Sequence, residues 1–242
     1  MVNTIVIMLQ VTRMDIAMHT DGLPDLRLMQ LVSPALPIGA FTYSQGLEWA
    51  IECGWVSNEG DLQDWLLGQM QDGLAHLDLP ILKRLYHACE GNDVALAEHW
   101  SSYLLASRET RELRQEEINR GRALTTLLND LSVGDADAYA LALNQTQAAG
   151  FSMAAVFWQI PLQQVGLGYA WGWLENQVAA AIKLIPLGQT AGQRVQLEMS
   201  VYLPEVVNTG FNLPDDDIGA SAPAVAIASS LHETQYTRLF RS

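Results

Sequence analysis

Residues 28–50 constrain the fold of this chain most, because two helical patterns there flank a segment that cannot be helical. Leu28 begins an apolar cluster at helical spacing. Pro34 and Pro37 then end the first helix, since proline lacks an amide proton and biases the preceding residue away from the helical conformation. Thr42 and Gln45 have the spacing of a capping box, which predicts the start of a second helix. The segment is therefore predicted to be helix, rigid loop and helix.

The loop between these two helices is unusually apolar for a surface connection. Its apolar residues are Val32, Ala35, Leu36, Ile38, Ala40 and Phe41. One interpretation places the loop underneath the core. The other makes it an exposed apolar ridge that binds another protein, since large exposed apolar patches usually mark interfaces.

The rest of the chain follows helical periodicity, and signals for strands are weak. Gly54 stands where a helix C-cap is expected, and Pro80 lies in the first turn of another helix. Asp135 is predicted to cap a helix that ends at Gly150, and Pro204 to close a later one. These patterns predict an all-α, single-domain helical bundle of about nine or ten helices.

Four parts are expected along the chain. Residues 1–22 are predicted to be a flexible N-terminal extension, and residues 23–203 the all-α core. Residues 204–222 carry three consecutive aspartates and are predicted to be a mobile acidic loop. Residues 223–242 are predicted to return to helix and to form a partner-docking tail.

Charge and cysteine content exclude several classes of partner. The chain has 27 acidic and 13 basic residues, a formal net charge of -14, which argues against nucleic acid and anionic membranes. Its cysteines, Cys53 and Cys89, form no CxxC pattern, and no signal peptide is evident, so we expect a cytoplasmic protein.

Residues 138–174 carry no charge, but glutamines and a proline interrupt them, so we expect buried bundle helices rather than a membrane span.

The densest charge cluster is residues 107–122. Arg108, Arg111 and Arg114 are three residues apart, and Arg108 can pair with Glu112 across one helical turn. One interpretation is a solvated helical face with weak ion pairs. The alternative is an arginine edge that contacts a partner or lies between subunits.

Two further segments carry isolated polar signals. Glu175 and Lys183 are eight residues apart on a predicted helix and lie broadly on one side, which either meets water or forms a polar contact site. Near the end of the chain, His232, Tyr236 and Phe240 recur at helical spacing. This segment could dock on its own core or on a partner.

Sequence patterns of catalysis are absent: there is no HExxH, Walker A or GxSxG pattern. His87 and Cys89 are two residues apart and would point in different directions from a helix, so they make a poor metal site. No catalytic or metal-binding residue is therefore predicted, and a binding protein is favoured over an enzyme. Two alternatives stay open: a generic homodimeric adaptor, and an all-α enzyme with a pocket lined by Tyr, Trp and Gln.

Four separated motifs resemble the UreF family of urease accessory proteins, and the resemblance covers residues 26–242. The motifs read SPALPIGAFTYSQGLE, SRETRELR, AAIKLIPLGQ and HETQYTRLFRS. Ala40 stands where the family commonly has Gly, and Thr42 where it commonly has Ser. The resemblance implies an all-α cytoplasmic chaperone without a cofactor of its own.

The same resemblance implies partners. UreF proteins are understood to dimerise, to bind UreD and to recruit the GTPase UreG, so that Ni²⁺ reaches apo-urease, whose active-site lysine is carbamylated. The chain would favour one nucleotide and metal state of the GTPase. By resemblance, the tail would bind UreD. Tyr43, Glu48 and Lys183 would lie on a GTPase-facing or assembly surface. The arginine run would take part in assembly. The expected partner-binding residues are Tyr43, Glu48, Arg108, Glu109, Arg111, Arg114, Lys183, His232, Glu233, Tyr236, Arg238, Leu239, Phe240 and Arg241.

Overall fold

The computed structural model describes residues 22–220 and 222–242, and over these residues the chain is helical without strands. The all-α prediction is therefore confirmed, whereas the predicted flexible extension lies almost entirely outside the described residues. The α-helices are α1 (Leu23–Val32), α2 (Leu47–Glu52), α3 (Glu59–Gln69), α4 (Leu79–Glu90), α5 (Val94–Ala106), α6 (Arg111–Asp130), α7 (Ala140–Leu143), α8 (Gln147–Phe157), α9 (Leu162–Leu184), α10 (Gln189–Ser200), α11 (Leu203–Asn212) and α12 (Pro223–His232).

Three further helical segments complete the described chain: the 3₁₀ turns η1 (Ala40–Thr42) and η3 (Asp215–Asp217), and the π-helix η2 (Met70–Asp78). The twelve α-helices within residues 22–220 and 222–242 exceed the nine or ten expected. Short pieces account for the difference, because α2 has six residues and α7 has four.

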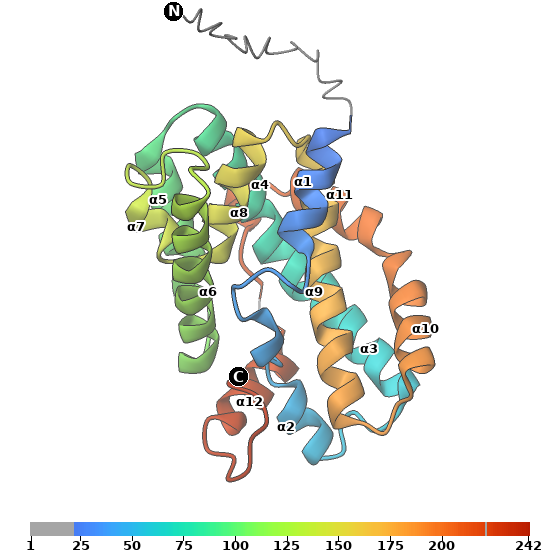
Figure 1. Ribbon diagram of the computed structural model, residues 1–242. Helices are drawn as coiled ribbons and strands as arrows, with labels where there is room; N and C mark the ends of the chain where they lie inside the picture. Colours follow the sequence, from blue (N-terminus) through green and yellow to red (C-terminus); the bar gives the residue numbers. More distant parts are fainter. Residues whose placement is uncertain (1–21, 221) are drawn as a thin grey trace, which may run out of the picture.

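The long helix α9 and the buried helix α4 organise the bundle (Figure 1). Helices α1, α10 and α11 pack against α9, while α5 and α8 pack against α4 and α6 packs against α8. Helix α12 packs against α2 and α6, so the C-terminal segment lies at the end of the bundle where α2 is found.

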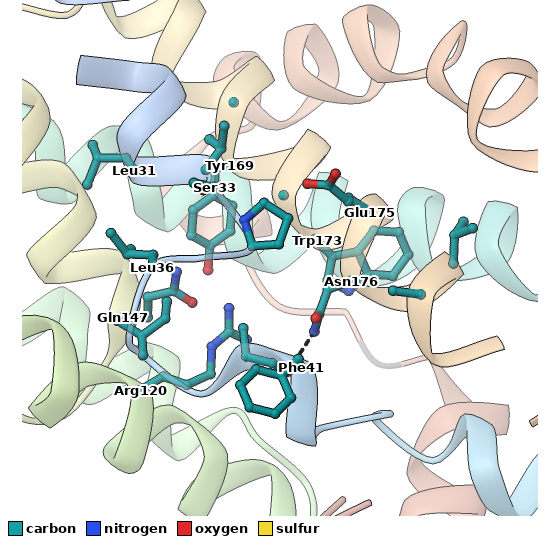
Figure 2. A pocket seen from close by; sticks show the side chains of 18 of the residues that line it. Leu31, Ser33, Leu36, Phe41, Arg120, Gln147, Tyr169, Trp173, Glu175 and Asn176 are labelled. Atoms are coloured by element: carbon teal, nitrogen blue, oxygen red, sulfur yellow. Dashed lines mark hydrogen bonds between the residues drawn. The ribbon is translucent and has the colours of Figure 1, made fainter. Parts of the chain in front are cut away.

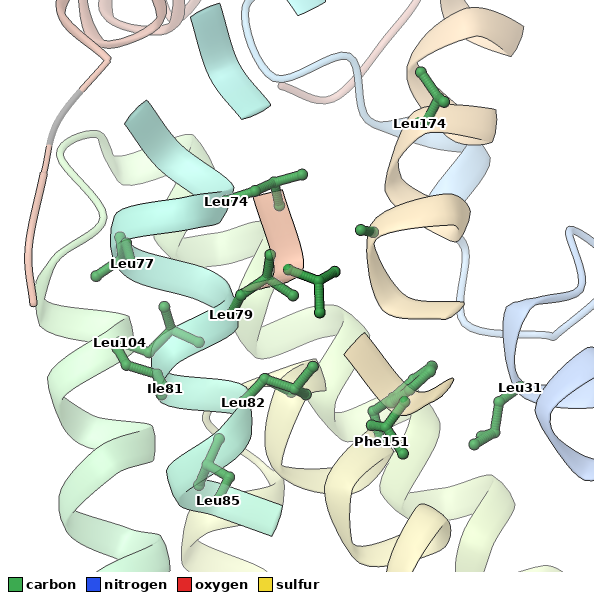
Figure 3. Close-up of a cluster of buried hydrophobic side chains, with 14 of the residues drawn as sticks. Leu31, Leu74, Leu77, Leu79, Ile81, Leu82, Leu85, Leu104, Phe151 and Leu174 are labelled. Carbon is green, nitrogen blue, oxygen red and sulfur yellow. The ribbon is translucent and has the colours of Figure 1, made fainter. Parts of the chain in front are cut away.

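Leucine side chains fill the centre of the bundle (Figure 3). Leu79, Ile81, Leu82 and Leu85 of α4 are all fully buried, so this helix has no solvent-facing stripe over its first two turns. Phe151 of α8 is buried in the same core cluster. Each such side chain contributes about 1.5–3 kcal/mol by leaving water.

The expected capping box before α2 does not form. Gly46, with φ +83°, is the residue that precedes the helix, and an added Cβ there would lie 2.8 Å from the amide nitrogen of Ser229. The hydroxyl of Thr42 instead donates to the Gly39 carbonyl in η1, at 2.8 Å. Gln45 has a positive φ and turns its side chain to Glu116, so contact with distant residues replaces the local cap.

The predicted helix from Asp135 to Gly150 is also wrong. Two helices, α7 and α8, replace it, and the hydroxyl of Thr146 accepts a hydrogen bond from the amide of Ala149 at the start of α8. Gly150 lies inside α8, where an added Cβ would be 2.9 Å from Leu124. This glycine serves close helix packing and does not end a helix.

The predicted acidic loop and C-terminal helix both need correction. Pro204 lies in the first turn of α11, so residues 204–212 are α-helical, and Arg84 pairs with Asp215 in η3. At the C-terminus, α12 ends at His232. Residues 233–242, called the tail below, form turns and bends instead of helix.

Candidate partner-docking site

The tail returns along the segment that precedes α2. The amide of Arg241 donates to the carbonyl of Thr42 at 2.8 Å, and the amide of Ser44 donates to the carbonyl of Ser242 at 2.7 Å. The Ser44 hydroxyl donates to the same carbonyl. Residues almost two hundred positions apart are thereby joined through their backbones.

Glu48, in the first turn of α2, holds the middle of the tail. One carboxylate oxygen accepts the amide of Leu239 at 2.6 Å, and the other accepts the amide of Phe240 at 2.9 Å. Such hydrogen bonds to a charged group are worth about 1.5–3 kcal/mol each. The helical hydrogen bonds that these two amides would make are replaced by bonds to Glu48, which explains why the helical spacing of the tail misled the prediction.

His232, the last residue of α12, links two carboxylates. Its Nε2 lies 3.1 Å from Glu48 and its Nδ1 lies 2.6 Å from Glu112, and the ring is completely buried. Each ring nitrogen therefore lies within hydrogen-bond distance of a different carboxylate, one from α2 and one from α6. Glu112 also accepts from Arg238 at 2.7 Å, so a chain of polar contacts runs from α2 through His232 to the tail.

Two more contacts fix the ends of the tail to α6. The carboxylate of Glu233 accepts the amide of Arg111 at 2.9 Å and that of Glu112 at 3.3 Å. A carboxylate at this position satisfies free amides of the helix N-terminus and complements its dipole. At the other end, the hydroxyl of Ser242 donates to Glu116 at 3.1 Å.

Anchored in this way, the tail exposes some of its predicted docking residues and buries others. Tyr236 is fully exposed and Leu239 is 65% exposed, whereas Phe240 is 6% exposed. The ammonium of Lys183 lies over the ring of Phe240 at 5.5 Å and over that of Phe41 at 5.9 Å. Lys183 thus connects α9, the apolar loop and the tail by cation–π contacts.

Part of the apolar loop packs under the core and part of it is exposed, so each of the two interpretations holds for some of its residues. Ile38 is buried in the core cluster and Leu36 packs against it, while Phe41 is exposed.

Arg108 does not lie on a solvated helical face or pair with Glu112 as expected. It precedes α6 and points inward, where its guanidinium bonds to Asp78 at 2.5 Å and to Glu117 at 2.5 Å. Burial raises the pKa of Asp78 even though Arg108 beside it acts in the opposite direction. Charge periodicity could not reveal this because Asp78 lies thirty residues away.

The remaining expected residues divide between surface and interior. Arg111, Arg114 and Glu109 are exposed, with Arg114 donating to the carbonyl of Arg108. Tyr43 and Glu48 were expected on a surface but are buried, and the hydroxyl of Tyr43 accepts a hydrogen bond from Asn119 at 3.1 Å. Both side chains therefore support the tail region from inside.

Sequence reasoning missed the α6 carboxylates that face the tail. Glu112 and Glu116 are one helical turn apart, so their spacing alone placed them on one side of the helix. Nothing local distinguished that side from a solvated one.

Within residues 22–220 and 222–242, no three His, Cys, Asp or Glu side chains are grouped so that they could hold a metal ion. Across the same part of the chain, none of the helices combines the length and apolar character that crossing a membrane requires.

Comparison with known proteins identifies the family. The UreF family model matches residues 56–200. A urease accessory protein UreF of Alcanivorax borkumensis is 54% identical over 222 residues, covering 89% of this chain and 97% of that protein. Proteins of the same name from Pseudomonas putida and Citrobacter koseri are 51% and 48% identical, covering 90% and 92% of this chain and 97% and 100% of theirs. The chain therefore belongs to the UreF family of urease accessory proteins.

Proposed function

We propose that this chain is a non-catalytic, cytoplasmic assembly subunit that binds UreD through its tail and recruits UreG during nickel delivery to apo-urease. Membership of the UreF family supports the role in urease maturation. The observation that carries the assignment of the surface is the anchored tail, with Tyr236 and Leu239 exposed on it. A protein that holds two large apolar side chains in water on a fixed frame gains a pre-ordered contact for a partner.

Some tail residues hold the tail on the body of the protein, and others are exposed for a partner. Glu48 and His232 fix its backbone, and Phe240 fixes it to the body, while Tyr236, Leu239 and Arg238 remain accessible to UreD. Arg238 also contacts Glu112, so the start of α6, with Arg111 and Arg114, and Glu109 just before it border the same surface. We place the assembly role of these three residues at this border.

Lys183 is the residue we assign to the GTPase-facing side. It is exposed and lies over the rings of Phe41 and Phe240. The affinity of a partner that contacts Lys183 would therefore depend on the positions of the loop and the tail. Binding that differs between nucleotide states of UreG would then bias those states without any catalytic group on this chain.

A homodimer is also part of the proposal. Exposed apolar side chains away from the tail could supply its surface: Leu26 and Met29 on α1, Leu197 on α10, and Val201 directly after α10. Exposed apolar side chains of this size are typical of surfaces that contact another protein.

The test replaces both exposed tail anchors, Tyr236→Ala and Leu239→Ala, in the full chain and measures co-purification with UreD. We expect a loss of at least about tenfold, since two apolar anchors are removed. Leu141→Ala, at a similarly exposed leucine of α7, is the matched control and should bind normally.

The same variants are then added to apo-urease with UreD, UreG, Ni²⁺ and GTP. Urease activation should fall with the double variant and stay normal with the control. Undiminished UreD binding by the double variant would remove the tail from this proposal, and full activation without any form of this chain would remove the proposal itself.

A further inference from the structure

A cavity of about 260 Å³ lies beneath the apolar loop, between α6, α8 and α9 (Figure 2). Residues 33–41 form one wall, and Arg120, Gln147 and Tyr169 come from the three helices. Figure 2 shows the guanidinium, the amide and the phenol hydroxyl of these side chains pointing toward a common space. The tail and its contacts lie outside this cavity.

Two residues that line the cavity, Arg120 and Gln147, each have a buried polar atom without a hydrogen-bond partner among the described residues. Arg120 donates to Glu116 through Nη1 at 2.7 Å, but its buried Nε has no hydrogen-bond acceptor. Gln147 is 7% exposed, and its Oε1 has no donor. Buried polar groups are ordinarily hydrogen-bonded, so these two atoms require a bound water or a small ligand.

The chemistry of these groups restricts that partner. Burial raises the pKa of Tyr169 well above its ordinary value, so its hydroxyl stays protonated and can donate. Arg120 offers a further N–H donor on the edge of its planar guanidinium, which matches the oxygens of a planar oxyanion. Gln147 Oε1 adds an acceptor for a ligand that also carries an O–H.

We propose that this cavity binds a small planar oxyanion, a monocarboxylate or hydrogencarbonate, with Arg120 and Tyr169 as donors. A cation is disfavoured because the nearby carboxylates of Asp78, Glu116 and Glu117 already accept from guanidinium groups. The site also provides no histidine or cysteine as a ligand.

The charges around the cavity couple this binding to protons. Arg108 and Arg120 face the three carboxyls of Asp78, Glu116 and Glu117, which leaves one excess negative charge when all are ionised. Burial raises the pKa of both Asp78 and Glu116, against the opposing effect of the arginines. Glu175 also lines the cavity, and burial raises its pKa too.

An anion favours the protonated form of a neighbouring carboxyl, so binding takes up a proton. Affinity should therefore be higher at low pH and should weaken as the pH rises and the carboxyls ionise.

The test titrates the full chain with sodium acetate and, separately, sodium hydrogencarbonate at constant ionic strength, following tryptophan fluorescence because Trp173 lines the cavity. We expect saturable binding with Kd of about 0.1–10 mM, the range open to a ligand of four heavy atoms. For acetate, Kd should rise as the pH is raised and the carboxyls ionise. No saturation by either anion up to about 50 mM overturns the proposal.

Variants locate the site and separate the two ligands. Tyr169→Phe should weaken binding of the anion by roughly three- to tenfold through loss of one donor. Tyr139→Phe is the matched control, because Tyr139 has a buried hydroxyl without a partner among the described residues and lies outside the cavity. Equal affinity for both variants and the unaltered chain would place any binding elsewhere and refute the site.

Gln147→Leu removes an unpartnered acceptor and so should fold normally. It should weaken hydrogencarbonate, which carries an O–H, more than acetate. If Gln147→Leu loses affinity for hydrogencarbonate but not for acetate, hydrogencarbonate is the better-fitting ligand. If Gln147→Leu and the unaltered chain bind acetate equally and saturably, the ligand belongs to the carboxylate class.

Discussion

At the scale of single residues, burial separates side chains of the same type. Cys53 is exposed, whereas Cys89 is buried and its burial raises the thiol pKa to about 12. Arg108 and Arg111 differ in the same way, since one is enclosed by two carboxylates and the other is exposed. Residue type and spacing alone did not distinguish these pairs.

The two thiols should therefore react at very different rates. At about pH 8, a disulfide reagent should modify one thiol in the folded chain and two after denaturation, because the thiolate is the reactive form and Cys89 hardly ionises. Cys53→Ser should abolish the fast phase. Equal rates for two thiols in the folded chain would show that Cys89 is accessible.

At the scale of elements, glycines decide how closely helices approach. Gly121 of α6 faces the α7–α8 connection, where an added Cβ would lie 2.7 Å from the carbonyl oxygen of Leu143 and 3.0 Å from backbone carbon of Thr146. Backbone atoms cannot rotate aside as a flexible side chain can. Gly68 of α3, by contrast, has open space around the same position.

Gly121→Ala should lower the free energy of unfolding by about 1–3 kcal/mol through overpacking. Gly68→Ala should instead raise it by about 0.5–1 kcal/mol, because alanine favours a helix more than glycine does. Urea denaturation of both variants measures the difference. Shifts of the same sign would contradict the close contact at α6.

At the scale of the whole molecule, Glu48 joins the beginning of the chain to its end. Its carboxylate accepts from two tail amides and contacts His232. Glu48→Gln exchanges one acceptor oxygen for an amide that donates, so these bonds cannot all be kept.

Amide hydrogen exchange at Leu239 and Phe240 should become at least about tenfold faster in Glu48→Gln, and trypsin should cleave after Arg238 more rapidly. Glu198→Gln, at an exposed glutamate of α10, is the control and should leave both rates unchanged. An unchanged tail in Glu48→Gln would show that the other contacts suffice to hold it.

The sequence by itself determined the helical class and several helix ends. Gly54 follows α2 in the left-handed conformation, and Pro80 lies in the first turn of α4, both as predicted. These features depend on neighbours within one or two turns, which the sequence displays directly. The family motifs likewise identified the relatives, since they are contiguous segments.

Only the tertiary structure decided where the charged residues and the tail lie. Glu48 meets Leu239 across 191 positions, and Arg108 meets Asp78 across 30. Helical periodicity reports which residues share a face but not what covers that face, so it could place neither the buried arginine nor the non-helical tail. The cavity beneath the loop has the same origin, because its polar groups come together only when α6, α8 and α9 pack.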